Sequence, residues 1–164
     1  MWRWLEGKIF LGRPTLQVPV VYIALEEKKG EVGKNLSTLG VAGEPLFFHF
    51  GLPPAKALEQ IDALVAETGA GLVVIDTLQK LARIRDLNDY SQVTNTLVSL
   101  LDVARKRNCH IMLLHHVGKM EHSEGDEVLG STALLAAVDT AIFLKKREQG
   151  RTLSTIQRYG ENIP

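Results

Sequence analysis

The sequence predicts an α/β fold with a mostly parallel sheet, on three observations. Short apolar runs without polar alternation, typical of strands buried on both faces, recur along the chain. Segments with apolar residues at helical spacing lie between these runs. The composition, 45% hydrophobic and 23% charged over 164 residues, is that of a globular protein and excludes disordered and collagen-like classes. Strands that alternate with helices form β-α-β units, so we expect one domain over residues 1–164.

The first half of the chain holds three expected strands and two expected helices. Residues 18–25 form a nearly continuous apolar run, and the charged residues after it end the strand. Apolar residues at helical spacing then predict a helix that stops at Gly40. Residues 46–50 read as a short strand, and an amphipathic helix ending near Gly69 follows. Residues 71–76 are the clearest buried strand in the chain.

The second half continues the alternation of helices and strands and ends in an expected hairpin. Residues 79–89 are polar and predict a loop, and the amphipathic helix after them is closed by the basic residues 105–107. Residues 111–114 predict another buried strand, and the Gly-rich, charged segment 117–130 predicts a loop. The last expected elements are a short helix at 133–137 and strands at 140–144 and 152–157. We expect these two strands to form an antiparallel hairpin at an edge of the sheet.

Charge and cysteine content restrict the function classes. Lys and Arg number 19, as do Asp and Glu, so the formal net charge is zero and no whole-molecule attraction to nucleic acid or anionic membranes is expected. The one cysteine, Cys109, cannot form an internal disulfide. The sequence shows no secretory signal and no apolar stretch of membrane-spanning length. We therefore expect a cytoplasmic protein that does not act at a membrane.

Acidic and imidazole side chains follow three of the expected strands. Glu26 and Glu27 follow the first strand, Asp76 and then Thr77 end the third, and His116 follows the fourth. Ligands of open parallel sheets collect at the carboxyl ends of the strands. There, one carboxylate can support magnesium, a second can polarise an attacking water, and an imidazole can hold a phosphate oxygen. Taken singly, Asp76 is more typical of a helix cap, and Glu26 is more typical of a solvated charged face.

Other chemistries find less support in the sequence. Zinc-ligand spacing is not found among His110, His115, His116 and His122. Cys109, beside a buried strand, reads as a small apolar residue. The phosphate-binding motif Gly-x-x-x-x-Gly-Lys-[Ser/Thr] does not occur, and residues 30–35 are the nearest approach to it. Their glycines are too close together and Asn replaces the hydroxyl residue, so we expect the start of an ordinary helix there.

The order of these motifs resembles the RecA-like ATPases, over nearly the whole chain. The matching series is Glu26 after an apolar strand, then LVVIDTLQ at 72–79, IMLLHHVGK at 111–119, GSTA at 130–133 and VDT at 138–140. The chain looks most like RepA-type plasmid helicases and their AAA-named relatives, with DnaB-type helicases and KaiC more distant. The resemblance implies a three-layer α/β/α core that binds ATP and magnesium, assembles as a homo-oligomer, and works in DNA replication or recombination.

The resemblance also implies roles for single residues. Glu26 matches the catalytic glutamate that activates water, and Asp76 matches the Walker B aspartate that supports magnesium, with Thr77 beside the nucleotide. His116 matches the polar sensor that ends the fourth strand, where relatives often carry Gln. Arg158 matches the arginine that reaches the ATP of a neighbouring subunit. Relatives often carry a lysine two residues earlier, where this sequence has Ile.

The resemblance leaves two alternatives open. The loops at 79–89 and 117–130 match segments that face single-stranded DNA, and they carry Lys80, Arg83, Arg85 and Lys119; solvated loop charge is an equally good interpretation. The absence of the Walker A loop predicts that the chain begins one β-α unit late, as a fragment or as a naturally truncated relative. We then expect ATP binding and hydrolysis by this chain alone to be weak or absent. The alternative function is a non-catalytic assembly or regulatory module.

Overall fold

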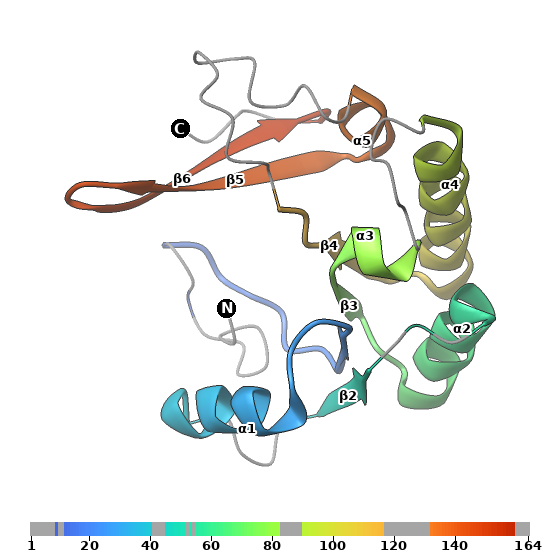
Figure 1. Cartoon of the computed structure of the whole chain (residues 1–164), viewed down its shortest axis with the longest axis horizontal. Coiled ribbons are helices and arrows are strands. Elements are labelled where there is room, and N and C mark those ends of the chain that lie inside the picture. The colour runs from blue at the N-terminus through green and yellow to red at the C-terminus, as the bar shows by residue number, and fades with distance from the viewer. Residues whose placement is uncertain are drawn as a thin grey trace. The chain divides into compact units, whose positions relative to one another are not determined.

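The computed structural model describes residues 9, 12–40, 45–51, 53, 55–82, 90–116 and 132–159. The chain divides into two compact units, one formed by residues 1–85 and 98–116 and the other by residues 86–97 and 117–164. The elements are β1 (Val20–Ala24), α1 (Lys29–Thr38), β2 (Leu46–Phe50), α2 (Ala57–Thr68), β3 (Leu72–Asp76), α3 (Leu78–Leu81), α4 (Tyr90–Arg107), β4 (His110–Leu113), α5 (Thr132–Ala137), β5 (Thr140–Arg147) and β6 (Gly150–Gln157) (Figure 1).

The first unit is built on a four-stranded sheet in the order β2-β1-β3-β4. Every neighbouring pair in this sheet is parallel. The α/β fold with a parallel sheet, predicted from uninterrupted apolar runs, is therefore confirmed. Every residue of β1 is buried, as are the first four of β3, which explains why neither strand shows the polar alternation of a half-exposed strand.

The register of the sheet divides the strand residues between two faces. Val20, Tyr22 and Ala24 share one face with Leu72 and Val74, and these five form a buried cluster. On the opposite face, side chains of β1 and β2 line a small cavity together with α2, whose buried residues are Ile61 and Val65. A two-residue alternation of side chains makes this division strict, so a carboxylate at the end of β3 has a fixed face.

The helix α2 ends at a glycine and forms ion pairs with α4. The helix α2 stops at Gly69, which adopts the left-handed conformation (φ 64°) that residues with a Cβ rarely take. Asp62 of α2 accepts hydrogen bonds from Arg107 Nε at 2.7 Å and Lys106 Nζ at 2.8 Å, at the end of α4. These contacts hold the pKa of the Asp62 carboxyl well below its usual range. They tie α2 to the C-terminal end of α4.

Two local expectations are corrected. The loop expected at 79–89 begins instead with the short helix α3, because Leu78 and Leu81 are buried and hold its single turn. The hairpin of β5 and β6 is antiparallel as expected, but in the described part of the chain it forms a separate two-stranded sheet and not an edge of the parallel one. Residues 30–35 lie within α1, an ordinary helix, as predicted.

The hairpin belongs to the second unit. Its register pairs Thr140 with Gln157 and Arg147 with Gly150 across the full length of both strands. Within the described residues, no helix combines the length and the apolar character needed to cross a membrane.

Candidate functional site

The carboxyl ends of β1, β3 and β4 are joined by backbone hydrogen bonds. Leu25 N–H donates to the Asp76 carbonyl at 2.9 Å, which ties the end of β1 to the end of β3. Leu114 N–H donates to the Ile75 carbonyl at 2.9 Å, and Leu78 N–H donates to the Leu114 carbonyl at 3.1 Å. These bonds extend the sheet beyond its last paired residues. The side chains that follow the three strands therefore start from one rigid edge.

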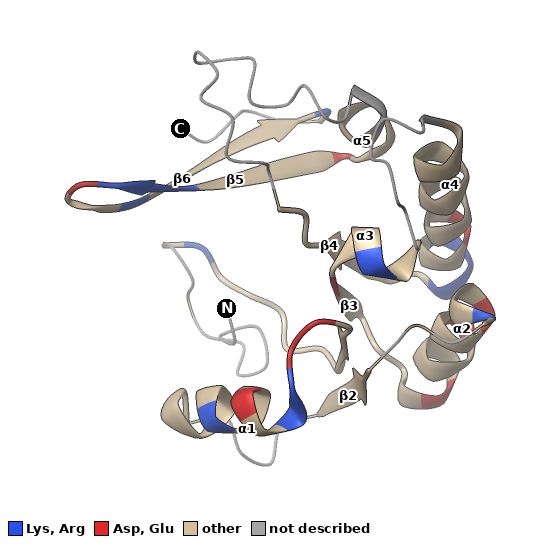
Figure 2. Cartoon of the chain, in the orientation of Figure 1, with Lys and Arg blue, Asp and Glu red and all other residues tan. Residues whose placement is uncertain are grey.

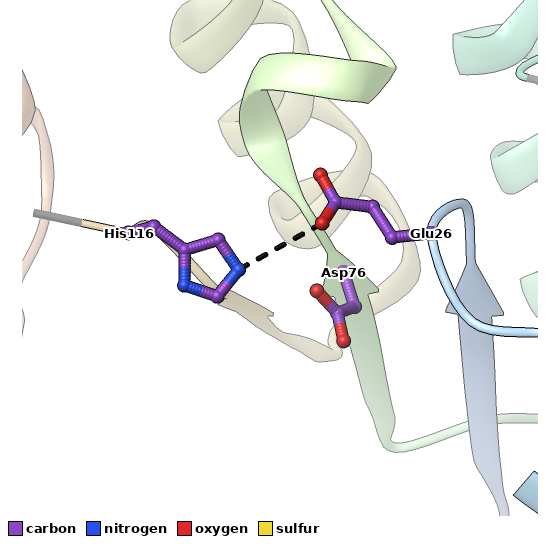
Figure 3. Close-up of side chains that lie close together, drawn as sticks. All are labelled: Glu26, Asp76 and His116. Carbon is purple, nitrogen blue, oxygen red and sulfur yellow. Dashed lines mark ion pairs between the residues drawn. The ribbon is translucent and has the colours of Figure 1, made fainter. Parts of the chain in front are cut away.

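Glu26, Asp76 and His116 converge at this edge. One ligand atom from each of the three side chains lies within 4.8 Å of the corresponding atoms of the other two. His116 Nε2 lies 3.8 Å from Glu26 Oε2, and the Asp76 carboxylate lies beside this pair (Figure 3). The predicted meeting of these three residues at one rim of the sheet is confirmed.

The carboxylates of Glu26 and Asp76 each accept a hydrogen bond from a hydroxyl group. Thr77 Oγ1 donates to Glu26 Oε1 at 3.0 Å, and Tyr22 OH donates to Asp76 Oδ2 at 3.1 Å. One oxygen of each carboxylate is thus oriented by a hydroxyl, and the other oxygen of Glu26 lies 3.8 Å from His116 Nε2. The Thr77 side chain, predicted to lie beside a nucleotide, is used in this structure to orient Glu26.

Tyr22 is a site residue that the sequence analysis missed. It lies in the middle of β1, opposite Val74, while Asp76 pairs with Ala24, so the phenol reaches diagonally along one face to the end of β3. Burial, the charges of Asp76 and Glu27, and the hydrogen bond to Asp76 all raise the pKa of the Tyr22 phenol far above its usual value. The phenol therefore stays protonated and acts as a donor. Only the strand order, which the sequence does not state, could have revealed this contact.

The environment of the cluster combines negative charge with access to solvent. The Glu26 side chain is 34% exposed and that of His116 is 74% exposed, while Asp76 is partly buried. Figure 2 shows acidic residues directly after β1 and at the end of β3. Carboxylate oxygens are hard ligands of the kind that magnesium prefers, and magnesium keeps several waters when it binds to proteins. The residues present thus fit a magnesium ion held at Asp76, directly or through water.

His115, Cys109 and His110 lie on or beside β4 and do not belong to the cluster. Burial, followed by the charge of His116, lowers the pKa of His115. Cys109 is buried, and burial raises the pKa of its thiol, so it matches the small apolar residue that was predicted. His110, at the start of β4, lies at the opposite end of that strand from His116. The described histidines therefore do not gather into one cluster around Cys109.

The other predicted site residues are Lys80, Arg83, Arg85, Lys119 and Arg158. Lys80 is exposed on α3. Arg83, Arg85 and Lys119 lie outside the described residues. Arg158 belongs to the second unit, where its guanidinium donates to the Ala136 carbonyl and lies 3.6 Å from the Asp139 carboxylate.

A family model described as an AAA domain matches residues 1–122 of the 164. This range contains β1 to β4 and all three residues of the cluster. No curated protein matches the chain.

Proposed function

We propose a function on the premise that this chain belongs to the AAA domain family, whose model matches residues 1–122. Membership relates the chain to P-loop ATPases. We propose that Glu26, Asp76 and His116 form the magnesium and water-activating side of an ATP hydrolysis site. The observation that carries this proposal is the approach of the three side chains to within 4.8 Å of one another at the carboxyl ends of parallel strands.

We propose a different role for each of the three residues. When bound, magnesium and ATP supply the reacting phosphoryl group and the charge that neutralises its oxygens. Asp76, oriented by Tyr22, would hold the magnesium ion directly or through water. Glu26, oriented by Thr77, accepts a proton from the attacking water at its own second oxygen. His116, the most exposed of the three, donates a hydrogen bond to a phosphate oxygen.

A nucleotide titration tests this proposal. Binding of a fluorescent ATP analogue is measured with and without magnesium, for this chain and for a version preceded by a strand, a Gly-x-x-x-x-Gly-Lys-Thr loop and a helix. We expect binding near the millimolar range for the chain and clearly tighter, magnesium-dependent binding for the extended version. Asp76→Asn should remove the magnesium dependence, whereas Asp102→Asn, on an exposed position of α4, should not. An extended version that binds no better than the chain contradicts the proposal.

A non-catalytic assembly or regulatory module is the second candidate function. Such a module would not need the phosphate-binding motif, which does not occur among the 164 residues given. It predicts no gain of nucleotide binding in the extended version, together with self-association. Sedimentation of the chain at several concentrations, without nucleotide, measures that association.

The finer parts of the proposal concern DNA and a neighbouring subunit. We propose a RepA-like or DnaB-like role in DNA replication or recombination, with Lys80, Arg83, Arg85 and Lys119 facing single-stranded DNA. Arg158 would reach the ATP of a neighbouring subunit in a homo-oligomer. Its contacts with Ala136 and Asp139 would have to open for that reach. If substitution of these four cations leaves binding to single-stranded DNA unchanged, the proposed contact with DNA is contradicted.

A further inference from the structure

The cluster at the sheet edge contains a nitrogen ligand that a magnesium site does not need. Magnesium binds through oxygen ligands and loses its waters reluctantly, so a carboxylate pair suffices for it. Imidazole nitrogen is instead a preferred ligand of zinc and other first-row transition ions. His116 Nε2 lies 3.8 Å from Glu26 Oε2, which is close enough for both atoms to bind one ion.

We propose that Glu26, Asp76 and His116 bind a divalent transition ion, with zinc as the reference ion, and that this ion inhibits the site. The inhibitory part rests on the function proposed above. The metal-binding part stands on the geometry of the three side chains alone.

The distances permit a common ion after a small adjustment. Zinc–nitrogen and zinc–oxygen bonds are about 2.1 Å long and zinc sites are generally tetrahedral, so two ligand atoms of one ion lie about 3.4 Å apart. The ligand atoms of the cluster lie within 4.8 Å of one another, so the side chains need to close by up to about 1.4 Å. The side chains of His116, 74% exposed, and Glu26, 34% exposed, have room for such a movement.

The surroundings supply what a metal site needs beyond its direct ligands. Metal-binding carboxylates are generally hydrogen-bonded on their outer side, and this support fixes their orientation. Thr77 gives that support to Glu26 and Tyr22 gives it to Asp76. The two carboxylates add a local charge that attracts a divalent cation, and Glu27 lies next to Glu26 in the chain.

Occupation by such an ion would stop the proposed chemistry. A Glu26 oxygen bound to zinc is not free to accept a proton from water. His116 bound through Nε2 is likewise lost as a donor to phosphate. The ion would therefore act as an inhibitor that competes with magnesium at Asp76.

Zinc binding to the unmodified chain tests the site, with a chromogenic zinc chelator as competitor and without nucleotide. We expect one zinc per chain. His116→Gln should weaken zinc binding at least about tenfold, since even changes in the outer support of metal ligands cost 10- to 100-fold. The same variant should change magnesium binding less than about twofold, because magnesium does not require the nitrogen. His110→Gln, the same change at the opposite end of β4, is the matched control and should change neither.

Three outcomes would overturn the metal site: no zinc bound at one equivalent, equal binding by native protein and His116→Gln, or a loss of binding in His110→Gln. Asp76→Asn provides a second test if His116→Gln unfolds the protein, as judged by circular dichroism; zinc binding that survives Asp76→Asn also overturns the site. Because nucleotide is absent, failure of ATP binding leaves this result unaffected. Zinc binding without inhibition of ATP hydrolysis, measured in the version extended by a phosphate-binding loop, would overturn the inhibitory part alone.

Discussion

The parallel sheet and the C-terminal hairpin place their apolar residues differently. In β1 all five residues are buried, whereas β5 alternates between exposed and half-buried positions. Ile75 of β3 is fully buried, but Ile142 of β5 is 52% exposed and Leu144 is 65% exposed. Figure 2 shows basic residues near the turn of the hairpin. By contrast, acidic residues follow β1 and end β3 in the other unit. Burial on both faces sets the register of the parallel strands, and this fixes the positions of the side chains that follow them.

The largest expected difference between the two regions is in stability. Ile75→Ala should lower the free energy of unfolding by about 2–5 kcal/mol, because it removes buried methyl groups and leaves a cavity. Ile142→Ala should cost less than about 1 kcal/mol, because half of its side chain is already in water. Urea unfolding followed by circular dichroism measures both. Equal losses would mean that the hairpin is packed as firmly as the sheet.

The next effect compares Tyr22 in the parallel sheet with Tyr159 after the hairpin. Tyr22→Phe keeps the ring that packs against Phe48 but removes the hydroxyl that orients Asp76. We expect zinc affinity to fall about tenfold, as for other losses of outer support, with little change in folding. Tyr159→Phe makes the same change at a 74% exposed residue after β6 and should leave affinity unchanged. If both variants bind zinc like the native protein, Tyr22 does not orient the site.

The smallest effect concerns two ion pairs and pH. Asp62 contacts two cations and its pKa is lowered in the folded chain, so this pairing adds stability above the unfolded carboxyl pKa of about 3.9. That stability is lost as the pH falls through and below this value. Asp62→Asn should therefore flatten the fall of the melting temperature between about pH 6 and pH 3.

Asp139→Asn in the second unit is the matched control. Its carboxylate is 66% exposed and lies 3.6 Å from Arg158, so the change should be smaller. Melting curves recorded across this pH range compare the two variants. A larger effect for Asp139→Asn would reverse the proposed order of the two regions.

The sequence predicted the parallel sheet well because burial on both faces leaves a clear signal. The apolar runs at 46–50 and 71–76 became β2 and β3 within one residue. The meeting of Glu26, Asp76 and His116 followed from one rule, that the carboxyl ends of parallel strands lie at the same edge.

Contacts that depend on strand order or on local packing could not be predicted. Tyr22 reaches Asp76 only because β1 and β3 are neighbours, and periodicity does not reveal which strands pair. Thr77 donates a hydrogen bond to Glu26, which lies 51 positions away in sequence, and no pattern in the sequence indicates this contact. The turn α3 was hidden in a polar segment because only Leu78 and Leu81 anchor it.

The rate of ATP hydrolysis in two neighbouring variants tests the central claim most directly. Phosphate release is measured at saturating magnesium and ATP, in the version extended by a phosphate-binding loop, for Glu26→Gln and Glu27→Gln. Removal of a general base costs about 100-fold or more, so Glu26→Gln should lose nearly all activity while Glu27→Gln keeps most of it. Equal rates in the two variants would contradict the assignment of Glu26 to the reacting water.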